Sequence, residues 1–466
     1  MRRVRARTNA RATLAATVAT GWSGASLGCA PSQLATKGST IRGNLATVTA
    51  MAAVAALVAA AVPVAAADGQ PGVTKDVIRV GGVASPVDQP GPHSRQRFAT
   101  AFDGVAAYFE TVNGHGGVFG RTLKVVATID DRGSVSRNAA ANRSLVESKK
   151  VFAVIPEASQ AFAGATYLAV SGTPTFGWNT DPSWSVGNNL FGESGSYRCV
   201  SCPAVGAAFV AKQIGAAKAA VVTSGTRLAV QCGDGLVSGL EKYGIEVGFR
   251  VALSPATGTA DVVAAAQRAH DDGVQLVATC MVGVDGLARI ATALRSAGAD
   301  GTNVYATEGY GPSLLAALGK RARGVYLALP FAPWEQSPTS QGTRQFLAAM
   351  KRRHLVPTEP AQAGWIDGEL FVAGIQAAGK RFTQASVVDA INAMTNFDAS
   401  GMIAGVSWVS GGHAPGRKVC SAFVEARNGR FQPRFGTAGS PFVCFADNPL
   451  PGTLPGPGPA SGPAGP

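Results

Sequence analysis

Cysteines are the residues of this chain whose spacing is best suited to chemistry. Seven are present, and all but Cys29 lie beyond residue 67. Cys199 and Cys202 have the spacing of metal ligands, but a zinc site also needs a second pair of cysteines or nearby histidines. The histidines are isolated along the chain: His93, His115, His270, His354 and His413. The pattern favours disulfides over a metal site and predicts an oxidising compartment.

The six cysteines after residue 67 can be paired in many ways. Sequence proximity and topology favour one set of pairs. Cys232 and Cys280 are expected to pair because both follow predicted strands of one sheet. The complete set is Cys199–Cys202, Cys232–Cys280 and Cys420–Cys444.

Sequence motifs of common enzymes are either absent or lie in a predicted structural context that does not suit their function. The one GxSxG, Gly24 to Gly28, lies in the N-terminal segment and follows no predicted strand, which is the wrong context for a nucleophile. The glycine-rich stretch Gly114–Gly120 lacks a complete GxGxxG and follows a predicted helix. HExxH and P-loop motifs do not occur. We therefore expect no catalytic residues, no metal and no cofactor.

The formal net charge of +13 is concentrated near the N-terminus. Residues 1–67 contain arginines and lysine but no aspartate or glutamate. In the remainder, basic residues are scattered, and Lys351-Arg352-Arg353 is the densest run. A solvated helix face explains this run, and no aromatic residues alternate with it as in single-strand-binding proteins. We expect no nucleic-acid partner.

The N-terminal segment has the features of a secretory signal. Leu45 to Val62 is continuously rich in Ala, Val and Leu, with Arg42 before it and an acidic residue, Asp68, shortly after it. This pattern predicts export, with cleavage after Ala67. A weak membrane anchor is the alternative, because the run approaches spanning length. The long basic preface indicates either a later translation start or a lipid anchor at Cys29. The mature protein is expected outside the cytoplasmic membrane, either extracellular or in the cell envelope.

The elements that must position any site alternate regularly between Asp76 and Pro330. Short β-branched runs are followed by amphipathic stretches of helical length, one of them predicted over residues 158–170. Such runs suit strands that are covered on both faces, so we predict an α/β fold with doubly wound parallel sheets. Ligands of such sheets bind at the carboxyl ends of the strands. The predicted strands include 77–83, 123–129, 151–155, 219–223, 246–252 and 274–280.

The rhythm breaks between Phe191 and Pro203 and then restarts, which suggests a second lobe. Three later helical stretches bring too few strands for a third lobe and are expected to return to the first. The tail is rich in Pro and Gly and reads as a flexible linker. The expected organisation is a leader at 1–67, lobe I at 76–197 plus 330–410, lobe II at 198–329 plus 411–435, and a tail at 448–466.

Several segments in order resemble the exported branched-chain amino-acid-binding proteins of ABC transporters. These are type I periplasmic binding proteins, similar to the Leu/Ile/Val-binding protein. The resemblance covers roughly residues 75–435, and no single motif carries it. It runs through Gly116–Lys124, Asp130-Asp131, Leu145–Ile155, Tyr167-Leu168, Gly172–Pro174, Gln231–Gly235, Ala306–Gly309 and Gly324–Pro330. It implies two α/β lobes joined by hinge strands, with a ligand cleft between them.

The resemblance also implies a binding site. Ser159 stands where the family has a hydroxyl and backbone amides that hold a ligand carboxylate, and its predicted place at a helix start favours an anion. It is equally explained as a plain helix-initiating residue. Glu308 matches the glutamate that accepts a ligand ammonium, although a glutamate in such a loop is usually just solvated. Gly177, Trp178 and Asn179 occupy the loop that completes the site, where Trp178 covers an apolar ligand group or simply packs under the loop.

Two departures from the family bear on the ligand. Cys232-Gly-Asp-Gly235 stands where the family often has Tyr-Gly-x-Gly, and Cys280-Met-Val-Gly283 replaces a loop rich in Gly and Tyr. The second lobe then presents a disulfide instead of tyrosines. These changes put a leucine-like ligand in doubt, whereas an amino acid or other small carboxylate remains consistent.

The sequence thus predicts a monomeric solute-binding subunit that delivers a small molecule to ABC permease membrane subunits. A ligand-sensing module on the same fold shares every residue discussed, and adjacent permease and ATPase genes would separate the two. A secreted enzyme is the third hypothesis. The isolated histidines disfavour it, because an enzyme needs a nucleophile–base pair or a set of metal ligands.

Overall fold

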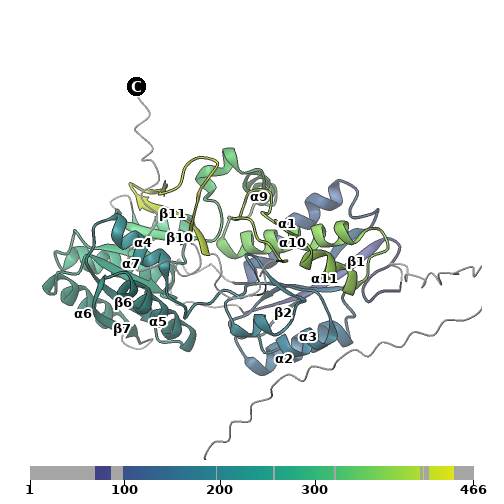
Figure 1. The fold of residues 1–466 in the computed structure, drawn as a ribbon, viewed down its shortest axis with the longest axis horizontal. Coiled ribbons are helices and arrows are strands. Elements are labelled where there is room, and N and C mark those ends of the chain that lie inside the picture. The colour runs from purple at the N-terminus through teal and green to yellow at the C-terminus, as the bar shows by residue number, and fades with distance from the viewer. Residues whose placement is uncertain are drawn as a thin grey trace, which may run out of the picture. The chain divides into compact units, whose positions relative to one another are not determined.

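The computed structural model describes residues 69–85, 98–195, 197–254, 258–319, 322–409, 413 and 419–445 (Figure 1). The predicted leader at 1–67 and tail at 448–466 lie outside these residues. Within them, no helix is both long and apolar enough to span a bilayer.

The first sheet is entirely parallel, in the order β2-β1-β3-β4-β5. Its central strand β3 is buried at every position, because helices cover both faces. We call this sheet with its helices the first lobe. Its strands are β1 (Val77–Ala84), β2 (Thr122–Asp130), β3 (Ala153–Ala158), β4 (Thr175–Gly177) and β5 (Leu190–Gly192).

Two helical layers flank the first sheet, as Figure 1 shows. One core packs Val83 and Val154 against Leu145 of α2 and Leu168 of α3. The other places Phe152 against Phe371 of α10. The helical segments of this lobe are η1 (Phe98–Thr100), α1 (Ala101–Gly114), α2 (Val135–Glu147), α3 (Ala165–Ser171), η2 (Pro182–Val186), η3 (Trp334–Thr339), α9 (Gln341–Arg352), α10 (Glu359–Ala378) and α11 (Gln384–Asn392).

Glycines allow α1 and α10 to pack backbone to backbone. A Cβ at Gly104 would lie 1.7 Å from the carbonyl oxygen of Ala361, and one at Gly364 would lie 2.0 Å from that of Ala101. We expect Gly104→Ala to lower the free energy of unfolding by roughly 1–3 kcal/mol, because the two helices must separate. Urea denaturation would measure the change. Gly114→Ala is the matched control, since nothing lies within 4 Å of a Cβ there. Equal midpoints for the two variants would contradict this prediction.

The second sheet has the order β12-β11-β10-β9-β8-β6-β7, with β13 paired to β11. Its strands from β6 to β10 are parallel, whereas β11 to β13 add antiparallel pairs. We call this sheet with its helices the second lobe. The α/β class is confirmed, but this sheet is mixed, because the chain after residue 419 returns to pair with β10. Its strands are β6 (Lys218–Ser224), β7 (Glu246–Leu253), β8 (Leu276–Cys280), β9 (Asn303–Ala306), β10 (Val325–Leu329), β11 (Val419–Arg427), β12 (Arg430–Arg434) and β13 (Phe442–Phe445).

Helices of the second lobe mostly follow its strands in βα order. Two of them begin with good N-terminal signals: the Thr226 side chain accepts from Ala229 N, and Pro312 opens α8. They are α4 (Val205–Gln213), α5 (Arg227–Lys242), α6 (Gly258–Asp271), α7 (Gly283–Ser296) and α8 (Pro312–Leu318).

Three disulfides join the cysteines after residue 67. They are the pairs favoured from the sequence. Cys232–Cys280 ties α5 to the last residue of β8, and Cys420–Cys444 joins β11 to β13. Cys199–Cys202 closes a short loop in the segment between β5 and α4.

Candidate functional site

A buried polar network lies at the carboxyl ends of β1, β2 and β3. Asn138 of α2 donates from Nδ2 toward Asp131 Oδ2 (3.1 Å), Glu157 Oε1 (3.1 Å) and Ser159 Oγ (2.9 Å). The Ser85 hydroxyl donates to Asp131 Oδ1 at 2.7 Å. Three strand ends are therefore fixed to one another by side chains, with Glu157 fully buried at the centre.

Ser159 does not open a helix, contrary to the sequence prediction. Helix α3 begins only at Ala165, and the chain between is held by side chains instead. Gln160 N donates to Ser85 Oγ, and Gly164 N donates to Asn138 Oδ1. The Ser159 side chain is 3% exposed and hydrogen-bonded to Asn138 and Glu157. Its hydroxyl is thus engaged inside the protein, and the helix-start argument for an anion at this position fails.

Gly177, Trp178 and Asn179 lie beside this network, at the end of β4. Trp178 N donates to Glu157 O at 2.9 Å, and a Cβ at Gly177 would lie 2.0 Å from that same oxygen. Trp178 is partly buried against Ala84, Ala101 and Ala158. Asn179 is buried, and its Nδ2 donates to Gly195 O at 2.7 Å. The structure brings these three residues close to Ser159 through Glu157, with Asn179 tying down the loop that follows β5.

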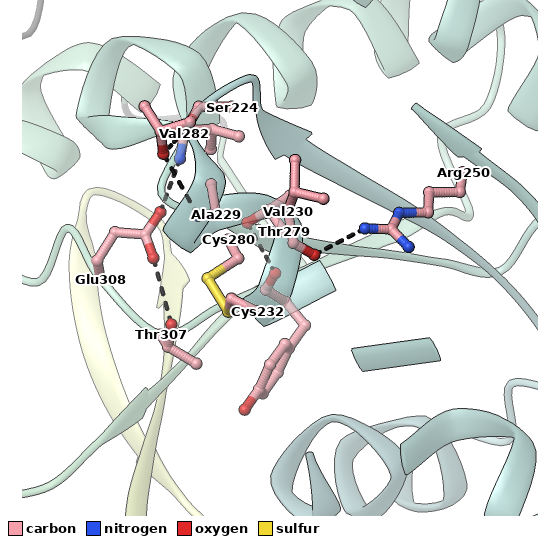
Figure 2. Close-up of a disulfide and its surroundings, with 12 residues drawn as sticks. Ser224, Ala229, Val230, Cys232, Arg250, Thr279, Cys280, Val282, Thr307 and Glu308 are labelled. Atoms are coloured by element: carbon pink, nitrogen blue, oxygen red, sulfur yellow. Dashed lines mark hydrogen bonds between the residues drawn. A yellow bond between two sulfur atoms is a disulfide. The ribbon is translucent and has the colours of Figure 1, made fainter. Parts of the chain in front are cut away.

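Glu308 lies in the second lobe, just after β9, and its carboxylate is held by a backbone turn (Figure 2). Val282 N donates to Glu308 Oε1 at 3.1 Å, and Thr307 Oγ1 donates to Oε2 at 3.2 Å. Met281 and Gly283 both have positive φ, at 54° and 69°, which turns successive amides toward one point. Burial raises the pKa of Glu308, and backbone amides of the 281–283 turn oppose that rise. The turn follows Cys280 of the disulfide, so the same short segment carries the disulfide and orients the Glu308 carboxylate.

Glu359 and Arg198 interact electrostatically, and no sequence motif marks either of them. Glu359 opens α10 in the first lobe, is 4% exposed, and accepts from Gly309 N at 2.9 Å. This hydrogen bond joins the first lobe to the residue next to Glu308. The charges of Glu308 and Arg198 both act on Glu359. Among the described residues, no hydrogen bond joins Glu308 directly to Ser159 or to Gly177–Asn179. The residues that follow it are bonded to the first lobe instead: Gly309 to Glu359, and Tyr310 to Glu335 and Trp334.

Two buried carboxyl groups make folding stability depend on pH. Burial raises the pKa of Glu157 from 4.5 to about 7 and that of Glu359 from 4.5 to about 8. A carboxyl group with a raised folded-state pKa stabilises the fold fully below its unfolded pKa, and that stability is lost as the pH rises through the folded value. We expect the melting temperature to fall between about pH 5 and pH 8.5, with Glu157 alone accounting for roughly 3 kcal/mol.

Thermal unfolding followed by circular dichroism across this interval measures the effect. Glu157→Gln should flatten the profile, whereas Glu241→Gln, an exposed change on α5, should leave its slope unaltered. A melting temperature that rises from pH 5 to pH 8.5 would contradict the prediction.

Comparison with known proteins identifies the family of this chain. A family model described as periplasmic binding protein matches residues 78–430. This chain belongs to the periplasmic binding protein family. The resemblance seen in the sequence is therefore confirmed. No curated protein sequence matches the chain significantly.

Solved structures of periplasmic binding proteins share the fold at low sequence identity. LivJ of Streptococcus pneumoniae, a branched-chain amino-acid binding protein in complex with isoleucine, is 16% identical, with a TM-score of 0.62 over 79% of this chain and 100% of its own. A fatty acid ABC transporter substrate-binding protein from Thermomonospora curvata is 17% identical, with a TM-score of 0.60 over 81% of this chain and 93% of its own. A solute-binding protein of R. palustris in complex with benzoate is 18% identical, with a TM-score of 0.58 over 81% and 100%.

These three periplasmic binding proteins are named as solute- or substrate-binding proteins, and their ligands differ in charge. Isoleucine carries an ammonium group as well as a carboxylate, whereas benzoate carries a carboxylate alone. The shared fold therefore does not identify the ligand of this chain, which depends on the side chains of its own site.

Proposed function

We propose that this periplasmic binding protein is the exported solute-binding subunit of an ABC importer. It captures a small amino acid or a related carboxylate by closing lobe I (76–197 plus 330–410) on lobe II (198–329 plus 411–435). It then delivers the ligand, as a monomer, to permease subunits in the membrane.

One observation carries the proposal. The carboxylate of Glu308 is oriented by the 281–283 turn, and the neighbouring Gly309 N donates to Glu359 of the other lobe at 2.9 Å. A preoriented carboxylate beside an interlobe contact is suited to hold a ligand ammonium where closure excludes water. Trp178 is proposed to cover an apolar ligand group, with Gly177 and Asn179 shaping the loop beneath it. Ser159 is proposed to support the site through Glu157.

Native mass spectrometry of the purified protein tests the function by identifying any co-purified ligand. Thermal-shift assays with L-isoleucine, octanoate and benzoate extend the test to protein isolated without ligand, because a bound ligand stabilises the folded state. A saturable shift with at least one small carboxylate is expected. Binding of none of them, together with no co-purified small molecule, would count against the proposal.

Export is a separate part of the proposal. N-terminal sequencing of the protein recovered outside the cytoplasmic membrane is expected to start near Asp68. A species that retains residues 44–67 would show an anchor instead. Co-purification with permease subunits would distinguish transport from sensing.

A further inference from the structure

Arg198 lies on the segment that leads from the first sheet to the second. Its backbone N donates to Asn179 O at 2.8 Å, which ties it to the end of β4. The next residue, Cys199, is joined to Cys202 by a disulfide. The backbone of Arg198 is therefore held by this hydrogen bond and by the disulfide at the next residue, beside the loop that carries Trp178.

Arg198 is partly buried. Among the described residues, it forms no ion pair and no side-chain hydrogen bond. A guanidinium presents five N–H donors in a planar fork that fits a carboxylate with two parallel hydrogen bonds. Water or a ligand must satisfy these donors.

The positive charge of Arg198 acts on two buried acids of the first lobe, Glu193 and Glu359. Glu193, which follows β5, is 2% exposed, and its Oε2 has no hydrogen-bond partner in the described chain. Burial raises the pKa of Glu193 and of Glu359, and the positive charge of Arg198 opposes the rise at both. Arg198 also acts on Tyr305 of β9, close to Glu308 in the sequence. The charge of Arg198 thus reaches Glu359, which accepts a hydrogen bond from Gly309 N, next to Glu308.

We propose that Arg198 is the anion anchor of the binding site, with its guanidinium holding the carboxylate of a small zwitterionic or monoanionic ligand. Glu308 then takes the ammonium group of a ligand that has one. The inference rests on the proposed solute-binding function. It replaces Ser159 in the anchoring role, because the Ser159 hydroxyl is already hydrogen-bonded within the buried network. Ligands without a carboxylate are expected to gain nothing from Arg198.

Titration calorimetry with matched probes tests this assignment. L-isoleucine and benzoate carry the carboxylate, whereas L-isoleucinamide and benzylamine lack it. Arg198→Gln should weaken binding of the two carboxylates by roughly 30-fold or more, because a desolvated charge pair is lost. Arg198→Lys should recover part of this affinity, since it restores the charge without the planar fork. Arg137→Gln, an equal charge change on the exposed face of α2, should bind like the unaltered protein.

The outcomes separate the inference from the proposed function. Carboxylate binding that is equal in Arg198→Gln and Arg137→Gln would overturn the anchor and leave solute binding intact. A preference of the unaltered protein for benzylamine, strengthened in Arg198→Gln, would also overturn the anchor and indicate a cationic ligand. No binding of any probe by the unaltered protein would overturn both. Circular dichroism of each variant shows whether it is folded, and the lysine variant preserves the test if the glutamine variant is not.

Discussion

Replacing Cys232 and Cys280 together with alanine is expected to lower the free energy of unfolding by about 2–5 kcal/mol. The bridge links residues 48 apart in the sequence, so its loss frees a long loop in the unfolded chain. Both cysteines are buried, and they join α5 to the end of β8. Guanidinium denaturation of the double variant, compared with the oxidised protein, measures the loss.

The matched control is the pair Cys199→Ala and Cys202→Ala, which opens a bridge of sequence separation 3. Its loop is short, so the stability lost should be smaller. Reduction of the unaltered protein opens all three disulfides and should therefore cost at least as much stability as the Cys232–Cys280 variant. The prediction is wrong if the Cys232–Cys280 variant unfolds at the same denaturant concentration as the control.

Glu308→Gln is expected to weaken binding of L-isoleucine by about 2–5 kcal/mol, which is roughly 30- to 5000-fold. The substitution keeps the shape of the side chain and an oxygen that can accept from Val282 N or Thr307. It removes the charge that would balance the ligand ammonium. Titration calorimetry isolates this electrostatic loss.

Benzoate serves as the internal control for Glu308→Gln, because it has no ammonium group to lose a partner. Its affinity should stay the same or increase. Exposed Glu241→Gln in the same lobe should change neither affinity. Unchanged binding of L-isoleucine in Glu308→Gln would mean that this carboxylate serves only the 281–283 turn.

The parts of the fold that the sequence predicted well are those with strong local patterns. The β-branched runs at 77–83 and 219–223 became β1 and β6 with ends shifted by one residue. Short elements such as β4, β5 and α8 have too few residues to show a period, and they were not predicted. The helix expected from residue 158 was displaced to Ala165, because side chains distant in sequence satisfy the backbone there.

In the candidate site too, the sequence indicated some residues and missed those whose role depends on contacts distant in the chain. Glu308 was reached through a resemblance that spans the chain, whereas Glu359 was missed. Its partner Gly309 is 50 residues away in the sequence, and nothing near Glu359 marks it as anything but a helix-starting acid. Arg198 was missed because its proposed role depends on Asn179, Glu193 and Glu359, which lie on different segments of the chain. Contacts of this kind arise only when the sheets are assembled.

The disulfides are unevenly distributed between the two lobes, so the lobes should differ in how strongly their stability depends on oxidation. The strands of the first sheet end at Gly192, and the first bridged cysteine in the part of the chain that the structure describes is Cys199. Among the described residues, the helices and strands of the first lobe hold no bridged cysteine, whereas the second lobe contains cross-links whose formation needs an oxidant. In a reducing medium, hydrogen exchange would first accelerate at the amides of β8 and α5, while those of β1 and β3 kept their protection. Reduction is therefore expected to lower the protection of the second lobe more than that of the first.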